Sequence, residues 1–167
     1  YLLSFLGCGG GSYDNTTSDS YSQPDEIIRE EKKTAQYEVD YYRSLEEWNQ
    51  EKKKHNNSYE YTLFFENSMS TYRCSTIVVV KDGAVYSRAQ KAYLRNAQTD
   101  NMEPLEKETW KESQKQLGTH DDAPKTLEEL YEDCSTILIV DPESNHIVFT
   151  MDNNQLMSTC GYSNLDC

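Results

Sequence analysis

Apolar residues are concentrated in two stretches of the chain, 59–94 and 127–162, and the segments before and between them are mostly polar. Alternate positions from Tyr59 to Phe65 carry large apolar side chains, which predicts a strand with one buried face. The run from Ile77 to Val80 is β-branched at every position, which predicts a central strand covered on both faces. Asp82-Gly83 then matches the two-residue turn of a β-hairpin.

A long helix is predicted before the first strand, from about Pro24 to Lys54. Acidic residues in its first turns and lysines in its last turn complement the helix dipole. Asn56 is expected to end it. Its apolar residues recur at helical spacing and form one stripe that we expect to lie on the sheet. The stripe consists of Tyr37, Tyr41, Leu45 and Trp48.

Two further helices are predicted in the second half of the chain. The residues from Thr126 to Glu129 have the pattern of a capping box, which predicts the start of a short helix. The polar segment from Pro104 to Leu117 is compatible with a helix that stops at Gly118.

One motif occurs twice. The segments from Cys74 to Val80 and from Cys134 to Val140 share five of seven positions, and the other two positions are aliphatic in both. A polar turn and another apolar run follow each copy, so each copy predicts a hairpin. Trp48 and Trp110 lie upstream of the two copies, each in a charged segment that we expect to be helical. The pattern therefore indicates a helix-plus-strands unit used in tandem.

These elements predict an α+β fold, in which helices pack on an antiparallel sheet. Residues 34–167 are expected to form a single domain, with related units at about 34–92 and 103–160. A last strand is expected from Gln155 to Cys160.

Residues 1–7 are mostly apolar and do not begin with Met, which predicts the remnant of a truncated secretory signal. The residues from Phe5 to Cys8 resemble a bacterial lipobox, in which the cysteine thiol is acylated and becomes the new N-terminus. A plain signal peptide with an ordinary cysteine is the alternative. Residues 8–33 would then comprise the lipidated Cys8 and a flexible tether. We expect a cell-envelope lipoprotein outside the cytoplasm, or a soluble secreted protein.

The net charge of −13 and a sequence pI near 4.6 argue against nucleic-acid binding, which needs clustered cations. Tyrosine is unusually abundant, with thirteen residues against four phenylalanines and two tryptophans. Tyrosines suit both half-buried strands and exposed contact surfaces. Tyr59, Tyr61 and Tyr86 are accordingly the candidates for a binding face.

Four cysteines besides Cys8 predict an oxidising compartment and up to two disulfides, with three possible connectivities. The two cysteines of the repeated motif could face each other across a pseudo-twofold axis. That arrangement would give the pairs Cys74–Cys134 and Cys160–Cys167.

His120 precedes two aspartates, Asp121 and Asp122, which could act as metal ligands or as partners of a catalytic base. The alternative is an acidic surface loop, because no third ligand follows at a motif spacing. The sequence contains no Gly-x-Ser-x-Gly motif and no Gly-rich phosphate loop in a strand–helix context. We therefore predict no catalytic residue, no resident metal and no cofactor.

A spaced set of residues between positions 45 and 160 resembles a known family. The set comprises Trp48, Tyr59–Tyr61, Cys74, Val78–Val85, Thr126–Tyr131, Ile139–Asp141 and Asp152. The family is that of small secreted proteins, many of them lipoproteins, with domain of unknown function 6174. The chain departs from its pattern at 143–146, where members carry a Gly-Tyr-Pro-like turn. The resemblance implies an extracytoplasmic location and implies no activity.

Three functional hypotheses remain open at this point. The first is a non-catalytic, membrane-anchored surface module that binds a protein or polymer through a flat face. The second is an inhibitor of a secreted enzyme, suggested by fold analogy with tandem helix-plus-sheet inhibitors. The third is a metal-binding or hydrolytic protein that uses the loop of His120, Asp121 and Asp122.

Overall fold

The computed structural model describes residues 2–3, 35–66, 71–120 and 122–165 of the chain. Cys8, the tether, Asp121, Cys167 and the predicted helical residues before 35 lie outside the described residues. Two α-helices and mostly antiparallel strands confirm the α+β class. The elements are β1 Leu2–Leu3, α1 Gln36–Lys54, β2 Tyr59–Glu66, β3 Tyr72–Lys81, β4 Ala84–Arg95, β5 Met102–Pro104, η1 Glu106–Glu108, β6 Trp110–Ser113, η2 Gln114–Gln116, α2 Leu127–Ile137, β7 Asn145–Met151 and β8 Met157–Asn164.

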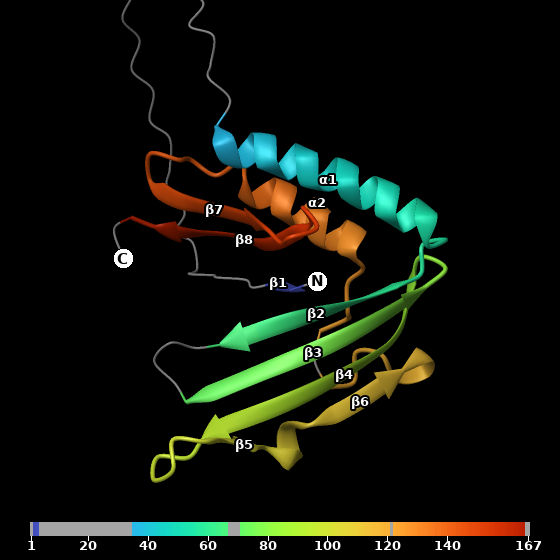
Figure 1. The fold of residues 1–167 in the computed structure, drawn as a ribbon, viewed down its shortest axis with the longest axis vertical. Coiled ribbons are helices and arrows are strands. Elements are labelled where there is room, and N and C mark those ends of the chain that lie inside the picture. The colour runs from blue at the N-terminus through green and yellow to red at the C-terminus, as the bar shows by residue number, and fades with distance from the viewer. Residues whose placement is uncertain (1, 4–34, 67–70, 121, 166–167) are drawn as a thin grey trace, which may run out of the picture.

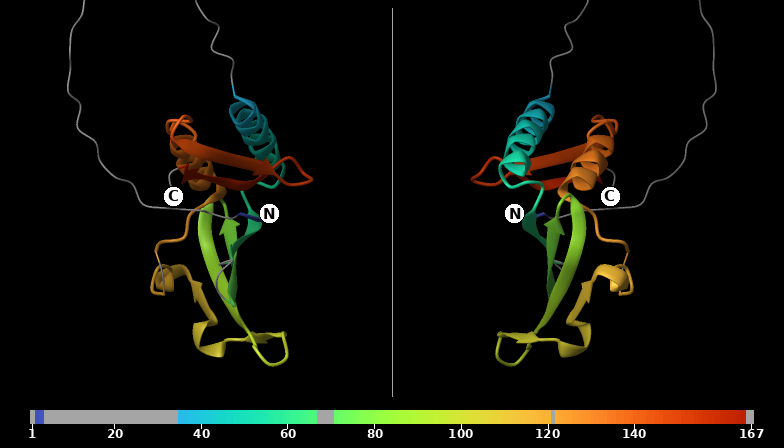
Figure 2. Two further views of the ribbon diagram at one scale, coloured as in Figure 1. Left: turned by 90° about the vertical axis from the view of Figure 1, so that its left-hand side faces the viewer. Right: turned by 90° about the vertical axis from the view of Figure 1, so that its right-hand side faces the viewer.

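The fold has two parts (Figure 1). One part is a long sheet in which the strands follow the order β1-β2-β3-β4-β5, with β6 also paired to β4. The other part is the β7–β8 hairpin with α1 and α2 packed beside it. The second part covers only one end of the long sheet, and the opposite strand ends extend away from it (Figure 2). The hydrophobic core lies where the two parts meet.

The hairpin of β3 and β4 confirms the first predicted turn. Asp82 and Gly83 have φ of 50° and 79°, the pair of positive values that a primed turn requires. As predicted, β3 is a central strand, between β2 and β4. Only Val78 and Val80, on one face near the end of the strand, are fully buried, whereas Ile77 and Val79 on the other face are half-buried. The expectation of cover on both faces was therefore wrong.

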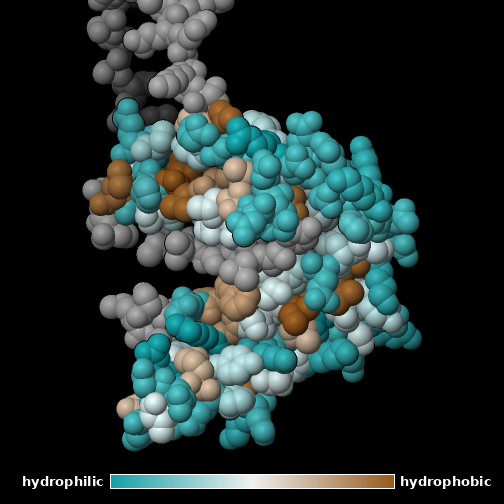
Figure 3. Space-filling model, in the orientation of Figure 1, coloured by the Kyte–Doolittle hydropathy of each residue, from teal (hydrophilic) through white to brown (hydrophobic). Residues whose placement is uncertain are grey.

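The apolar stripe of α1 packs as predicted. Trp48 is 1% exposed, and Tyr41 is also part of the core. Ser44 on the same side contacts the Tyr131 hydroxyl at 2.6 Å, and that hydroxyl also accepts a bond from the Met157 amide at 2.9 Å. This network joins α1, α2 and β8. The outward side of α1 is mostly hydrophilic (Figure 3).

The capping box is confirmed at the start of α2. The Thr126 hydroxyl accepts a bond from the Glu129 amide, and the Glu129 carboxylate accepts one from the Thr126 amide. The helix then continues through Cys134 to Ile137, where the repeated motif predicted a strand. The apolar residues after the cap recur at 127, 130, 131 and 134, which is a helical period. This period favours a helix, although the residues of the motif have high β propensity. The second hairpin is therefore β7–β8.

The prediction of a tandem repeat also fails for the segment from Pro104 to Leu117, which was expected to be helical. It forms no α-helix: Trp110 begins the strand β6, which pairs antiparallel with β4. An isolated helix here would have no continuous apolar stripe to bury. As a strand, the segment places its alternate residues Trp110 and Glu112 on the partly covered face beside β4.

The disulfide pairs Cys134 with Cys160, with 5.8 Å between their Cα atoms, so the predicted pair Cys74–Cys134 is wrong. Cys134 lies on a helix and Cys74 on a strand, so the two copies of the motif are not related by a local twofold axis. The proposed partner of Cys160, Cys167, lies outside the described residues. The bond ties α2 to β8 inside the core.

No helix among the described residues is long and apolar enough to cross a membrane.

Candidate functional site

Two of the three tyrosines proposed as a binding face, Tyr59 and Tyr61, pack where the two parts of the fold meet. Tyr61 is 1% exposed and donates a hydrogen bond to the Lys125 carbonyl, so the prediction that it contributes to a surface was wrong. Tyr59 is half-buried against Trp48, with 4.6 Å between ring centroids, and its hydroxyl accepts from the Leu127 amide at 3.0 Å. Burial raises the pKa of Tyr59 to about 12.

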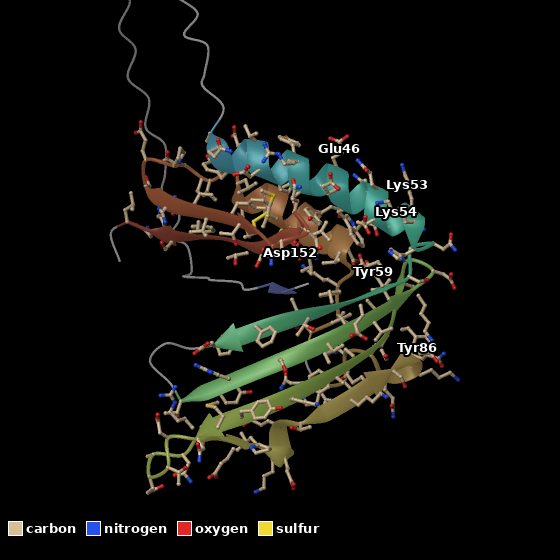
Figure 4. All side chains as sticks on the ribbon, in the orientation of Figure 1. Glu46, Lys53, Lys54, Tyr59, Tyr86 and Asp152 are labelled. Carbon is tan, nitrogen blue, oxygen red and sulfur yellow. A yellow bond between two sulfur atoms is a disulfide. The ribbon has the colours of Figure 1, made fainter. Side chains whose placement is uncertain are left out.

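Tyr86 differs from the other two because it is exposed. The Lys81 ammonium lies 3.6 Å from its ring centroid, a cation–π contact across the β3–β4 hairpin. Tyr59 lies near the end of α1, whereas Tyr86 lies near the start of β4 (Figure 4). The three candidates therefore do not form one exposed face.

Glu112 on β6 is fully buried although it carries a carboxylate. Its cross-strand neighbour Arg88 is also buried and donates from Nε to Oε2 at 2.8 Å. The backbone amides of Gly118 and His120 donate to the carboxylate at 2.9 and 2.6 Å, and the Thr119 hydroxyl donates at 3.0 Å. The carboxylate therefore holds the segment after β6 against the sheet.

The ionisation of Glu112 follows from these contacts. Burial by itself opposes ionisation of the carboxyl group. The hydrogen bonds from Arg88, Gly118 and His120 outweigh burial and hold the pKa of Glu112 well below its usual range. Glu112 and Arg88 are thus a buried ion pair at neutral pH.

His120, the histidine singled out by the sequence, completes this cluster. Its Nδ1 lies 2.8 Å from Oε1 of Glu112, and its ring stacks on Trp110 at 5.0 Å between centroids. The Arg88 guanidinium lies 4.9 Å from the centroid of Trp110. A carboxylate that orients an imidazole is a feature of catalytic dyads and metal sites. In this cluster it also closes a loop, because the same carboxylate binds the loop backbone.

Of the two aspartates beside His120, only Asp122 is described. Asp121 lies outside the described residues, and Asp122 is exposed. Within the ranges that the structure describes, no three His, Cys, Asp or Glu side chains are grouped so that they could hold a metal ion.

Sequence reasoning missed Glu112 and Arg88. Their types and positions give no local signal, because an Arg and a Glu separated by 24 residues are common in any acidic chain. The alternation of Trp110 and Glu112 predicts a strand face, but only the β4–β6 register shows that Glu112 lies opposite Arg88.

A second feature lies at the end of the sheet that the helices do not cover. It is a groove of about 290 Å³, which we call the free-end groove. Apolar side chains from β2, β4 and β5 line it, together with an ion pair between Glu66 and Arg73 at 2.5 Å. The lining residues are Phe64, Phe65, Glu66, Arg73, Cys74, Ser75, Tyr93 and Met102.

Exposure of large apolar side chains distinguishes this end of the sheet. Phe64 and Phe65 are 43% and 52% exposed, and Leu94 at the paired end of β4 is 43% exposed. The core residues Tyr61 and Val78 of this sheet lie nearer the other end of their strands. The helices and the β7–β8 hairpin contribute their core residues at that other end, so these phenylalanines retain contact with solvent.

Comparison with models of known protein families, with curated proteins and with solved structures found no match.

Proposed function

We propose that the protein is a non-catalytic binding module outside the cytoplasm, tethered to a membrane through Cys8, which binds an apolar ligand in the free-end groove. The exposure of Phe64 and Phe65 beside a groove is the observation that carries the proposal. Neighbouring exposed apolar residues around a concavity are typical of interaction sites.

The location rests on chemistry that is separate from the groove. The disulfide between Cys134 and Cys160 is compatible with an oxidising compartment. The lipobox-like residues before Cys8 direct its acylation, the acylated Cys8 is the anchor, and the polar segment after it is the tether. The proposal gives His120 a structural part, since its partner Glu112 also binds the loop backbone.

Substitution of Phe65 by serine tests the binding site. A naphthalene dye, 1-anilinonaphthalene-8-sulfonate, is small enough for the free-end groove, and Arg73 can pair with its sulfonate. Phe65→Ser removes about 1 kcal/mol of apolar contact with the dye, so we expect about fivefold weaker binding in a fluorescence titration.

A second hollow supplies the matched control. It measures about 170 Å³ and is lined in part by Ile139, which is 83% exposed. Ile139→Ser removes apolar surface there and is expected to leave dye affinity unchanged. If Ile139→Ser weakened the binding and Phe65→Ser did not, the free-end groove would lose its assignment.

Intact mass tests the anchor. Protein taken from the membrane fraction of a bacterium that expresses the full gene should begin at Cys8 and carry a diacylglyceryl group. A Cys8→Ala chain should lack the added mass and leave the membrane fraction. An unmodified Cys8 in the membrane-associated wild type would refute the proposed anchor and leave the groove to be judged by its own test.

A further inference from the structure

The edge of β2 that faces away from β3 has the properties of a template for another strand. One edge of β2 pairs with β3 along all eight residues without interruption. Its other edge faces away from β3. Its sequence, YEYTLFFE, contains neither lysine nor proline, two residues that often protect sheet edges from pairing. The register shift in this sheet lies in the pairing of β3 with β4. β2 has no β-bulge in its pairing with β3 that would distort its edge.

A short apolar segment of the chain already pairs with this edge. The dipeptide Leu2–Leu3 forms β1, which pairs parallel with β2 at Thr62 and Leu63. β1 lies between β2 and the β7–β8 hairpin, and it contacts β8 as well as β2 (Figure 1). The space between the two sheets thus accepts extended backbone.

The register of β1 leads toward the free-end groove. Leu2 lies opposite Thr62 and Leu3 opposite Leu63, so the pairing runs in the direction of the end of β2. A peptide that continued in this direction would lie beside Phe64, Phe65 and Glu66, all of which line the groove. The edge would bind its backbone, and the groove would bind an apolar side chain.

We propose that the β2 edge is a strand-addition site for an extended apolar peptide of a partner protein, which runs parallel to β2 and places a side chain in the free-end groove. This inference rests on the proposed function, because removal of the chain before Cys8 takes Leu2–Leu3 away and leaves the edge open. In a chain that keeps residues 1–7, this segment competes with the partner from within the molecule.

Proline substitution in β1 tests the site in the full 167-residue chain. Leu2→Pro and Leu3→Pro together remove both backbone donors of β1, so the internal competitor can no longer pair normally. The probe is a synthetic peptide with the sequence of residues 1–7, carrying a fluorophore at its C-terminus. We expect fluorescence anisotropy to show at least tenfold tighter binding by the double variant than by the unaltered chain.

Two controls separate strand addition from general hydrophobic binding. The same peptide N-methylated at alternate residues keeps its side chains but cannot form the ladder, and it should bind the double variant at least tenfold more weakly. Hydrogen exchange should show new protection of the β2 amides at the edge when the unmodified peptide is added. Equal affinity of the two peptides, or equal affinity of the two chains, would overturn the strand-addition site.

The dye titration tests the free-end groove independently of the peptide experiment. If the dye still depends on Phe65 while the heptapeptide fails to discriminate the chains, the binding module stands and strand addition fails. If neither the dye nor the peptide depends on Phe65, the groove fails as well. Loss of peptide binding in the Leu2→Pro/Leu3→Pro chain after addition of Phe65→Ser would support both.

Discussion

Replacing Glu112 by alanine is expected to destabilise the protein by about 3 to 5 kcal/mol, because it leaves the buried Arg88 without its counter-charge. The same change removes the acceptor for the amides of Gly118 and His120. Denaturation with guanidinium chloride, followed by tryptophan fluorescence, measures the loss. Glu132→Ala, an exposed acid on α2, is the matched control and should change stability by less than about 0.5 kcal/mol. A Glu112→Ala chain as stable as the control would contradict the role assigned to the ion pair.

Varying the pH separates the contribution of the Glu112 charge to stability from the contribution of its side-chain packing. Its folded-state pKa is held below the ordinary value of 4.5, so the folded state binds fewer protons than the unfolded state in mild acid. Its contribution to stability is therefore present above pH 4.5 and is lost as pH falls below that value. In a Glu112→Gln chain this contribution is absent. The stability difference between the two chains should shrink steadily on acidification.

Loss of the disulfide between Cys134 and Cys160 is the second large effect that we expect. The bond closes a loop with a sequence separation of 26 residues, which corresponds to about 3 to 4 kcal/mol through the entropy of the unfolded chain. The Cys134→Ala/Cys160→Ala chain should show this loss in denaturant unfolding. A reductant should lower the stability of the wild type by a similar amount and leave the double variant unchanged.

Cys74→Ser is the control for this prediction, since Cys74 lies on β3 and is not part of the disulfide. Its stability should remain sensitive to the reductant in the same way as that of the wild type. Mass spectrometry after alkylation should show Cys134 and Cys160 modified only once the protein has been reduced. Alkylation of both residues in the unreduced, folded protein would disprove the pairing.

The first half of the fold could be predicted from local patterns. The strand from Tyr59, the turn at Asp82-Gly83 and the apolar stripe that includes Trp48 each depend on a period or turn type that neighbouring residues specify by themselves. The capping box at Thr126 is similarly local and correctly predicted the start of α2.

Prediction failed where the same residue types can serve two structures. Cys-Ser-Thr-Ile is a strand at Cys74 and helical at Cys134, because the second copy follows a capped helix whose apolar residues already face the core. β propensity is weak beside such packing. The expected disulfide between the two copies failed for this reason, and the expected repeat failed here as well as at β6, where a strand replaces the predicted helix.

The sequence by itself determined the α+β class, the first hairpin, the end of α1 and the start of α2, because these depend on short-range periodicity, caps and turn chemistry. The candidate sites depended on the tertiary structure. Glu112 becomes a buried ion-pair partner only through the β4–β6 register, and the free-end groove lies at the strand ends that the core cluster does not reach. Contacts between residues far apart in the chain leave no period in the sequence, so only the folded structure could bring them together.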